Sequence, residues 1–272
     1  MQSDTQNRRI RERHDARTGW AFMAPFFIMF LLVFAVPICV AIYQSFFRQV
    51  ASGGGLYGGG ELTNQFVGLD NFAMVITSGD FWTGMGRVVV YAAFQIPFMI
   101  ISALVLALVL DSFLIRRVGF FRLTYFLPFA IPGIVAAMVW LYIYTPELSP
   151  IVKFFDSFGI HVDFMAPGAP ILASMANMTT WTYTGYNMLI FLAALQAIPH
   201  ELYEAARLDG ATSWQIVRQI KVPMVSSAAL LAVLLSIIGT IQLFNEPAVM
   251  YSSNRWMGNA YTPMMMAYNT MF

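Results

Sequence analysis

The chain has 272 residues, of which 58% are hydrophobic and only 11% charged, whereas a soluble domain has about 45–50% apolar and about 25% charged residues. This composition excludes an ordinary soluble domain, and the net charge of +1 argues against a nucleic-acid partner. The single cysteine, Cys39, excludes an internal disulfide and a cysteine-based metal cluster. We therefore expect an integral membrane protein.

Basic residues predict the orientation of the chain. Eleven of the fifteen lysine and arginine residues lie in three stretches, 8–17, 116–122 and 207–221. Long apolar runs separate these stretches, and short basic loops stay on the cytoplasmic side of a membrane during insertion. We therefore predict that residues 1–19 form a basic cytoplasmic N-terminal segment and that residues 20–272 form a membrane domain.

Five segments are apolar over about the 20 residues that a membrane-spanning helix needs. They are residues 20–43, 88–110, 123–144, 171–195 and 225–244. The first is longer than a signal-peptide core and has no small-residue cleavage site after it, so we interpret it as a span. The pattern predicts an all-α polytopic bundle. Its cytoplasmic loops are 111–122 and 196–222, and its outward segments are 46–87, 145–170 and the chain from about 247.

Three of these segments have unusual compositions. The third predicted span contains Pro128 and Pro132. The fourth carries six polar side chains, which are costly against lipid and should face a protein interior or a wet path: Asn177, Thr179, Thr180, Thr182, Thr184 and Asn187. The glycine-rich stretch Ser52–Gly60 lacks the Gly-Lys-Ser/Thr end of a phosphate-binding loop, so we interpret it as a flexible external loop.

The cytoplasmic loop 196–222 has the pattern of two short helices. Pro199 ends the fourth span, and a helix is expected to start at His200–Glu201 and to break at Gly210. Ser213 can cap a second helix, Trp214–Ile220, which is expected to end before Pro223. We call residues 200–222 the knob, because two amphipathic helices with a glycine corner are suited to docking on a partner. A surface loop without a partner is the alternative.

The knob carries a family signature. Glu204-Ala205-Ala206, three residues, Gly210, nine residues and Ile220-x-Val222-Pro223 resemble the EAA loop in membrane subunits of bacterial ABC importers. Four further segments resemble the carbohydrate-type branch, whose best-known member imports maltose: Phe66–Phe72 with Phe81-Trp82, Phe121-Arg122 with Leu127-Pro128 and Trp140, Leu208–Ala211, and Phe244–Pro247.

The chain departs from this family in three ways. Val222 stands where Leu is usual, and Arg87 where Asn is common. The chain also ends at Phe272, where a sixth span would begin, so a sixth span is expected beyond the chain end.

The resemblance implies a non-catalytic permease subunit with the type I importer fold in the bacterial inner membrane. It would bind no cofactor itself, because partner subunits use the ATP and Mg²⁺. The implied partners are a second homologous permease subunit, two ATP-binding subunits on the knob, an extracytoplasmic solute-binding protein and membrane lipid. The residues expected to couple the chain to the ATP-binding subunits are Glu204, Ala205, Ala206, Asp209, Gly210, Trp214 and Pro223.

Two polar stripes flank the knob at helical spacing. The fourth span carries Thr179, Thr182, Tyr183 and Tyr186 with Trp181 beside them, and the fifth carries Gly239, Gln242, Leu243 and Glu246. One face of each helix can therefore line a cavity for a neutral sugar. In the maltose importer the sugar pocket lies on the corresponding helices of the larger membrane subunit. Helix–helix contact is the alternative for such stripes.

Other classes of function fit less well. A secondary transporter or channel subunit would conduct solute through the stripes without ATP. An intramembrane enzyme would need paired catalytic groups, and Glu246 has no ionisable partner in the predicted spans. Asp156, His161 and Asp163 in an external loop could be imagined as metal ligands, but a solvated loop surface is the simpler interpretation, and we predict no metal site.

Overall fold

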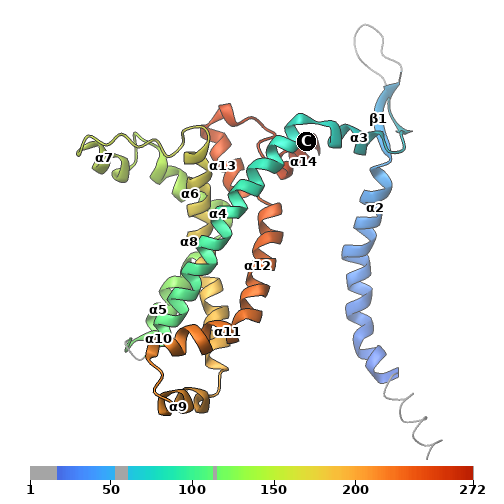
Figure 1. Cartoon of the computed structure of the whole chain (residues 1–272). Coiled ribbons are helices and arrows are strands. Elements are labelled where there is room, and N and C mark those ends of the chain that lie inside the picture. The colour runs from blue at the N-terminus through green and yellow to red at the C-terminus, as the bar shows by residue number, and fades with distance from the viewer. Residues whose placement is uncertain (1–16, 53–60, 113–114, 272) are drawn as a thin grey trace, which may run out of the picture. The chain divides into compact units, whose positions relative to one another are not determined.

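The computed structural model describes residues 17–52, 61–112 and 115–271 (Figure 1). The chain divides into two compact units, Met1–Ser78 and Gly79–Phe272. Most of the predicted basic N-terminal segment and of the glycine-rich loop lie outside the described residues. The predicted sixth span lies outside them as well.

Unit 1 begins with the first predicted span. A helix of 28 residues, Arg17–Gln44, is apolar enough to cross a membrane, and it contains a π-helical turn, η1 (Leu31–Ala35), before α2 (Val36–Gln44). Pro37 is the second residue of α2, just after this turn. A proline lacks the N–H that a regular helical ladder requires, and a π turn is one way to absorb the missing bond.

Unit 1 continues with a β-hairpin that the all-helical prediction did not include. Strands β1 (Phe47–Ser52) and β2 (Glu61–Phe66) pair antiparallel, with Phe47 opposite Phe66, and helix α3 (Asp70–Thr77) follows. The Asn71 side chain donates to the carbonyl oxygens of Ser45 and Phe47, at 2.9 and 3.0 Å, and accepts from Arg48 at 2.9 and 3.1 Å. Asn71 therefore fastens α3 to the base of the hairpin.

Unit 2 is helical. Its long helices are α4 (Gly79–Leu110), α8 (Ala169–Gln196) and α12 (Ser226–Ile241). Helix α4 runs beside α8, and α12 packs against both. The other elements are α5 (Val118–Phe126), η2 (Leu127–Ala130), α6 (Gly133–Tyr144), α7 (Pro150–Asp156), α9 (His200–Leu208), α10 (Ser213–Ile216), η3 (Val217–Lys221), α11 (Val222–Met224), α13 (Asn245–Ser253), η4 (Arg255–Met257) and α14 (Pro263–Met271). Figure 1 shows α9 at one end of unit 2 and α6, α7 and α13 at the opposite end.

The third predicted span, 123–144, is not one straight helix. Val118–Ala130 and Gly133–Tyr144 are bent by 95° relative to each other. The break lies at Ile131 and Pro132, which have extended backbones. A proline disfavours the helical conformation in the residue before it, so Pro132 accounts for the break. By length and composition, the described residues contain three helices able to cross a membrane, or four if this bent pair forms one span.

Helix α8 covers the fourth predicted span without interruption, and five of its six predicted polar side chains form hydrogen bonds inside unit 2. Asn177 donates to the Tyr144 hydroxyl at 2.8 Å, and Asn187 donates to the Tyr183 carbonyl at 3.0 Å. Gly185 lets α5 approach, because a Cβ at this position would overlap the carbonyl oxygen of Tyr125. The polarity of α8 is therefore used within the bundle, as the sequence predicted.

Arg87, which stands where Asn is common in the family, has a clear role in the fold. Its Nη1 donates to the Tyr261 carbonyl at 3.2 Å, and its guanidinium lies 4.3 Å from the centre of the Tyr261 ring. Nearby, Gly84 leaves room for Pro263, the first residue of α14. These contacts fasten the segment that leads into α14 onto α4, so Arg87 joins parts of the chain that are far apart in sequence.

Candidate functional site

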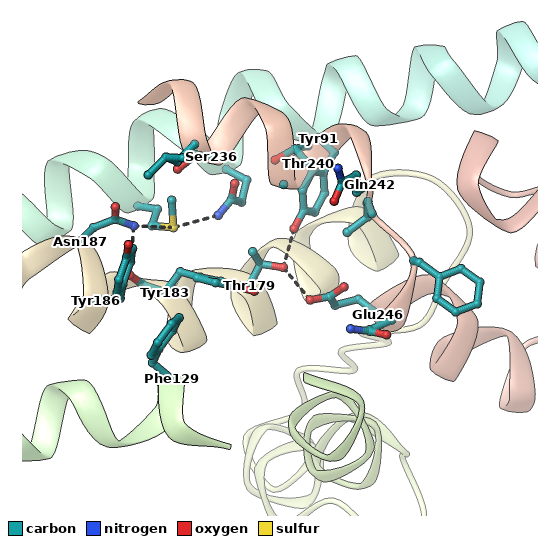
Figure 2. A pocket seen from close by; sticks show the side chains of 17 residues that line it. Tyr91, Phe129, Thr179, Tyr183, Tyr186, Asn187, Ser236, Thr240, Gln242 and Glu246 are labelled. Carbon is teal, nitrogen blue, oxygen red and sulfur yellow. Dashed lines mark hydrogen bonds between the residues drawn. The ribbon is translucent and has the colours of Figure 1, made fainter. Parts of the chain in front are cut away.

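Unit 2 contains a cavity of about 540 Å³, within the range of roughly 300–1,000 Å³ that small-molecule sites occupy. Figure 2 shows it between α4, α8, the segment around the end of α12 and the η2 turn. Its lining comprises Tyr91, Gln95, Met99, Phe129, Thr179, Tyr183, Tyr186, Asn187, Leu235, Ser236, Gly239, Thr240, Gln242, Leu243, Phe244, Asn245 and Glu246.

Seven of the nine residues predicted to bind substrate line this cavity: Thr179, Tyr183, Tyr186, Gly239, Gln242, Leu243 and Glu246. The other two do not line it. Trp181 packs edge-on against Trp140, with ring centres 5.8 Å apart. Thr182 is buried and donates to the Met178 carbonyl within its own helix at 3.0 Å.

The second stripe is not one face of a continuous helix, and that part of the prediction is wrong. Helix α12 ends at Ile241, whereas the predicted span ran to residue 244, and α13 starts at Asn245. In the break, Leu243 donates from its N–H to the Thr240 carbonyl at 3.1 Å, and its own carbonyl accepts from the Thr262 hydroxyl at 3.0 Å. A buried break requires such partners for its backbone, and Thr262 supplies one from a distant segment. The break itself turns these residues toward the cavity.

A chain of hydrogen bonds crosses the cavity wall from α4 to α13. The Tyr91 hydroxyl donates to the Thr179 hydroxyl at 2.7 Å, and the Thr179 hydroxyl donates to Glu246 Oε1 at 3.1 Å (Figure 2). Glu246 is thereby oriented by residues from two other helices. The stripes did not reveal Tyr91, although Tyr91, Gln95 and Met99 recur every four residues on α4, which is the spacing of one helical face.

The cavity lining also contains a buried amide, Gln95, and a stacked pair of aromatic rings, Phe129 and Tyr186. Gln95 is buried and donates to the Met99 sulfur at 3.3 Å, whereas its Oε1 has no hydrogen-bond partner among the described residues. Phe129 stacks on Tyr186 with ring centres 4.7 Å apart. A buried acceptor without a partner is costly unless a ligand or water donates to it. Donors, acceptors and flat rings together match the surface of a polyhydroxyl solute.

The knob has the predicted corner. Gly210 has a φ of +82°, which favours glycine, and it ends α9. The N–H of Ala211 donates to the Ala206 carbonyl at 2.9 Å, and the N–H of Gly210 to the Arg207 carbonyl at 3.1 Å. This pair of bonds is a Schellman motif, which satisfies carbonyls at a helix end. The predicted break at Gly210, with a positive φ, is confirmed.

Two details of the second knob helix differ from the prediction. Its cap is Thr212, not Ser213, in a capping box with Gln215. The helix also does not end before Pro223, because the π turn η3 leads into α11, which extends through Pro223 to Met224. The π turn changes the hydrogen-bonding register just where the proline lacks a donor.

One side of the knob is open. Leu208 and Trp214 are 89% and 70% exposed, and Glu204 is exposed one helical turn before Leu208 on α9. Of the other predicted coupling residues, Ala205, Asp209, Gly210 and Pro223 are exposed and Ala206 is half-buried. Leu208 joins this surface although it was not among those residues. Two large exposed apolar side chains with acidic neighbours form a surface suited to a protein partner.

The opposite side of the knob is anchored to the bundle. Lys221 Nζ lies 2.6 Å from Asp111 Oδ2, at the end of α4, and both side chains are largely buried. Lys221 Nζ also lies 5.3 Å from the centre of the Tyr203 ring on α9. Burial, with the Asp111 carboxylate adding to it, raises the pKa of the Tyr203 phenol above its ordinary value. Tyr203 therefore stays neutral, and three segments meet around one ion pair that the sequence did not predict.

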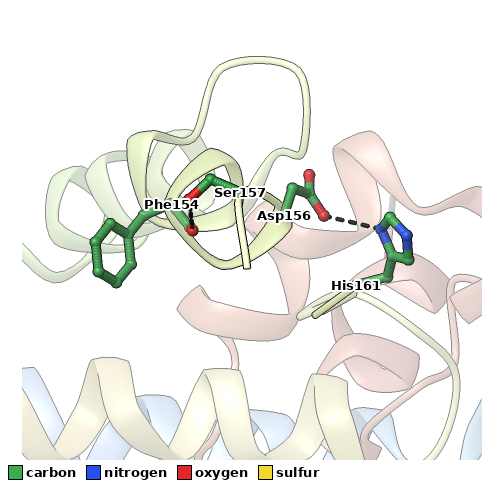
Figure 3. A network of polar contacts seen from close by, with 4 residues as sticks. All are labelled: Phe154, Asp156, Ser157 and His161. Atoms are coloured by element: carbon green, nitrogen blue, oxygen red, sulfur yellow. Dashed lines mark hydrogen bonds and ion pairs between the residues drawn. The ribbon is translucent and has the colours of Figure 1, made fainter. Parts of the chain in front are cut away.

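The loop at residues 145–170, which the sequence predicts to be external, does not bring Asp156, His161 and Asp163 together as three metal ligands. His161 Nδ1 lies 2.9 Å from Asp156 Oδ1, as Figure 3 shows, and the His161 side chain is exposed. Asp163 Oδ1 instead accepts from the Met165 N–H at 2.9 Å. Within the described ranges, no group of three or more potential ligands is placed to hold a metal ion.

Comparisons with known proteins give a consistent result. Residues 99–271 match the family described as "binding-protein-dependent transport system inner membrane component". The lactose transport system permease protein LacF of Rhizobium radiobacter is 29% identical over 246 residues, covering 89% of this chain and 78% of that protein. The sn-glycerol-3-phosphate transport system permease protein UgpA of Agrobacterium fabrum is 31% identical over 208 residues, covering 75% and 68%.

A solved structure shows the same fold. It is a bacterial alginate ABC transporter in complex with an alginate pentasaccharide-bound periplasmic protein. Its matching chain superposes with a TM-score of 0.69 at 19% identity, covering 96% of this chain and 90% of that one.

Proposed function

Because this chain belongs to the family of binding-protein-dependent transport system inner membrane components, and within it to the carbohydrate ABC importer permeases, we propose that it forms half of the membrane pathway of an ATP-driven importer of an oligosaccharide or similar sugar. A second, homologous permease subunit completes the pathway. An extracytoplasmic binding protein delivers the solute, and two ATP-binding subunits on the cytoplasmic side hydrolyse ATP. The chain itself lies in the bacterial inner membrane with its N terminus in the cytoplasm.

The cavity is the observation that carries the sugar proposal. Its wall combines hydroxyls and amides with stacked rings, including Tyr183, Gln242 and Asn187. A sugar needs donors and acceptors for its hydroxyls and a flat surface for the apolar face of its ring. The lactose permease protein among the relatives supports the same class of solute.

The knob supplies the proposed mechanical link. Closure of the ATP-binding subunits would move the exposed surface at Leu208 and Trp214, and the Lys221–Asp111 pair would pass the movement to the end of α4. Helix α4 also contributes Tyr91 to the cavity wall. A rigid-body movement of the knob therefore reaches the solute site through one continuous helix.

Filling the cavity tests this function. A Cβ on Gly239 meets no heavy atom within 4 Å, and Gly239 lines the cavity, so Gly239→Trp should fold but obstruct the solute. Gly86 on α4 also has open space at its Cβ, is exposed and does not line the cavity, so Gly86→Trp is the matched control. We expect Gly239→Trp to abolish solute uptake while the complex still assembles, and Gly86→Trp to retain uptake.

Normal uptake in Gly239→Trp would contradict the assignment of the cavity as the transport site. The same assay separates the alternative class. Uptake by a secondary transporter or channel would continue in the presence of vanadate, whereas uptake by an ATP-driven importer would stop, because vanadate traps its ATP-binding subunits.

A further inference from the structure

The cavity has an uneven distribution of charge. Among its described lining residues, Glu246 alone carries a formal charge, and no lysine, arginine or histidine accompanies it. We propose that Glu246 determines the charge selectivity of the cavity, which admits neutral polyhydroxyl solutes and rejects solutes that bear a carboxylate or a phosphate. This inference rests on the proposed function, because it assigns a class of solute to the same site.

Hydrogen bonds and a helix N-terminus hold the Glu246 carboxyl group in a fixed position at the cavity. Its Oε1 accepts a hydrogen bond from Thr179, which is in turn held by the Tyr91 hydroxyl. Glu246 is also the second residue of α13, where free backbone N–H groups and the helix dipole stabilise a negative charge. The carboxylate is thus held in place by hydrogen bonds at the edge of an open cavity.

Two basic side chains of unit 2 are held by partners that do not line the cavity. Arg87 is held by the Tyr261 carbonyl and ring, and Lys221 by Asp111 at the end of α4. An anionic solute in the cavity would therefore meet the Glu246 charge without compensation from these residues. At a separation of roughly 7 Å, in surroundings less polar than water, that repulsion reduces affinity by roughly tenfold.

A neutral sugar experiences the opposite effect. Its hydroxyl can donate to the Glu246 carboxylate, and hydrogen bonds to ionised acceptors are stronger than bonds between neutral groups. A hydroxyl can likewise donate to the unpaired Oε1 of Gln95, whereas at neutral pH a carboxylate has no proton to give and a phosphate monoester has lost most of its protons. Both acceptors in the wall therefore favour a donor over an anion.

Thiol reagents of opposite charge test the proposal without knowledge of the transported sugar. A reporter cysteine is placed in the cavity as Gln242→Cys or, separately, Gly239→Cys, in a Cys39→Ser background of the full complex. The reaction rates of the cationic trimethylammonioethyl and the anionic sulfonatoethyl methanethiosulfonates are then compared. Relative to a small free thiol, the reporters should favour the cation, and Glu246→Gln should lower this preference by roughly tenfold.

A control reporter, Ser157→Cys in the exposed external loop, should show no change of preference when Glu246 is replaced. An unchanged preference at both cavity reporters in Glu246→Gln would overturn the proposal, because the carboxyl would then carry no effective charge there. Failure of both cavity reporters to react would overturn it as well. The proposed function is judged separately, by whether modification of the reporter thiol in the Gln242→Cys or Gly239→Cys variant blocks uptake.

Discussion

The knob and the cavity are built in different ways. The knob consists of consecutive residues, 200–222, with its shape determined by a glycine corner and a capping box. The cavity takes its wall from α4, η2, α8 and the break between α12 and α13, which are far apart in the chain. A substitution in the knob should therefore disturb one local device, whereas a substitution in the cavity wall can disturb the packing of the whole unit.

The two regions also use different interactions to hold their positions. The knob is fastened to the bundle by a largely buried ion pair, Lys221 with Asp111. The cavity wall depends on close backbone approach at Gly185 and on the hydrogen bonds of Tyr91 and Thr179. The following substitutions test this contrast, beginning with the largest expected effect.

Gly185→Ala should have the largest effect. The new Cβ would overlap the Tyr125 carbonyl oxygen, which belongs to the backbone and cannot move without shifting α5. Overpacking of this kind costs about 1–3 kcal/mol and occasionally more. We expect a lower yield and a lower unfolding temperature of the purified complex. Gly239→Ala is the control, because its Cβ has open space, and equal unfolding temperatures in the two variants would refute the close-packing role.

Asp111→Asn should loosen the knob. It leaves the Lys221 ammonium largely buried without its charged partner, and losing a hydrogen bond to a charged group costs about 1.5–3 kcal/mol. We expect ATPase activity and uptake to become uncoupled, so that ATP is hydrolysed without proportional transport. The exchange of both residues, Asp111→Lys with Lys221→Asp, should restore part of the coupling. A double variant no better than Asp111→Asn would argue that the pair has no positioning role.

Gly210→Val should affect the knob alone. Its φ of +82° costs a β-branched residue about 1–2 kcal/mol, which is enough to distort an exposed corner. We expect less ATP-binding subunit to co-purify with this chain. Gly159→Val is the matched control, because Gly159 has a similar φ of +73° and open space but lies outside the knob, in the loop predicted to be external. Equal co-purification in both variants would mean that the corner does not contact the partner.

Tyr183→Ala should have the smallest effect. It removes a half-exposed phenol from the cavity wall, and each neutral hydrogen bond lost costs about 0.5–1.5 kcal/mol, or roughly two- to tenfold in affinity. Uptake should fall by that factor with altered selectivity among sugars, while the unfolding temperature changes little. Tyr142→Ala, an exposed tyrosine outside the cavity lining, is the control. A lower unfolding temperature with unchanged selectivity would instead support helix–helix contact.

The sequence predicted well the features that depend on neighbouring residues. It predicted only in part the features that depend on distant segments meeting in the fold. The start of α9 at His200 and the corner at Gly210 were each predicted from the residue itself and its close neighbours in the sequence. Both predictions are confirmed. The polar stripes identified much of the cavity wall, because helical spacing is also a local property. Tyr91 was missed since periodicity on α4 does not reveal which helix α4 faces. Asp111 and Lys221 were missed for the same reason, because 110 residues separate them.

The helix breaks at Ile131–Pro132 and after Ile241 show the same difference between local and long-range causes. Pro128 and Pro132 marked the third span as irregular, but the bend of 95° depends on how both halves pack against neighbours. The break after Ile241 contains no proline and no glycine at residues 242–244, but Pro247 follows it closely and cannot donate to the Leu243 carbonyl four residues before it, a local signal that the predicted span to residue 244 did not use. Its partner Thr262 lies about twenty residues later, and its hydrogen bond to Leu243 forms only in the folded unit.

The bend between η2 and α6 has a consequence for how the chain enters the membrane. Val118–Ala130 and Gly133–Tyr144 are each roughly 20 Å long at 1.5 Å per residue, whereas the hydrocarbon core is about 30 Å thick. Neither half can be released into lipid as an independent span during synthesis. Both halves pack against α8, whose polar side chains also disfavour lipid. We therefore expect the bent pair to remain at the insertion machinery until α8 has been made, so that these segments integrate together as one step.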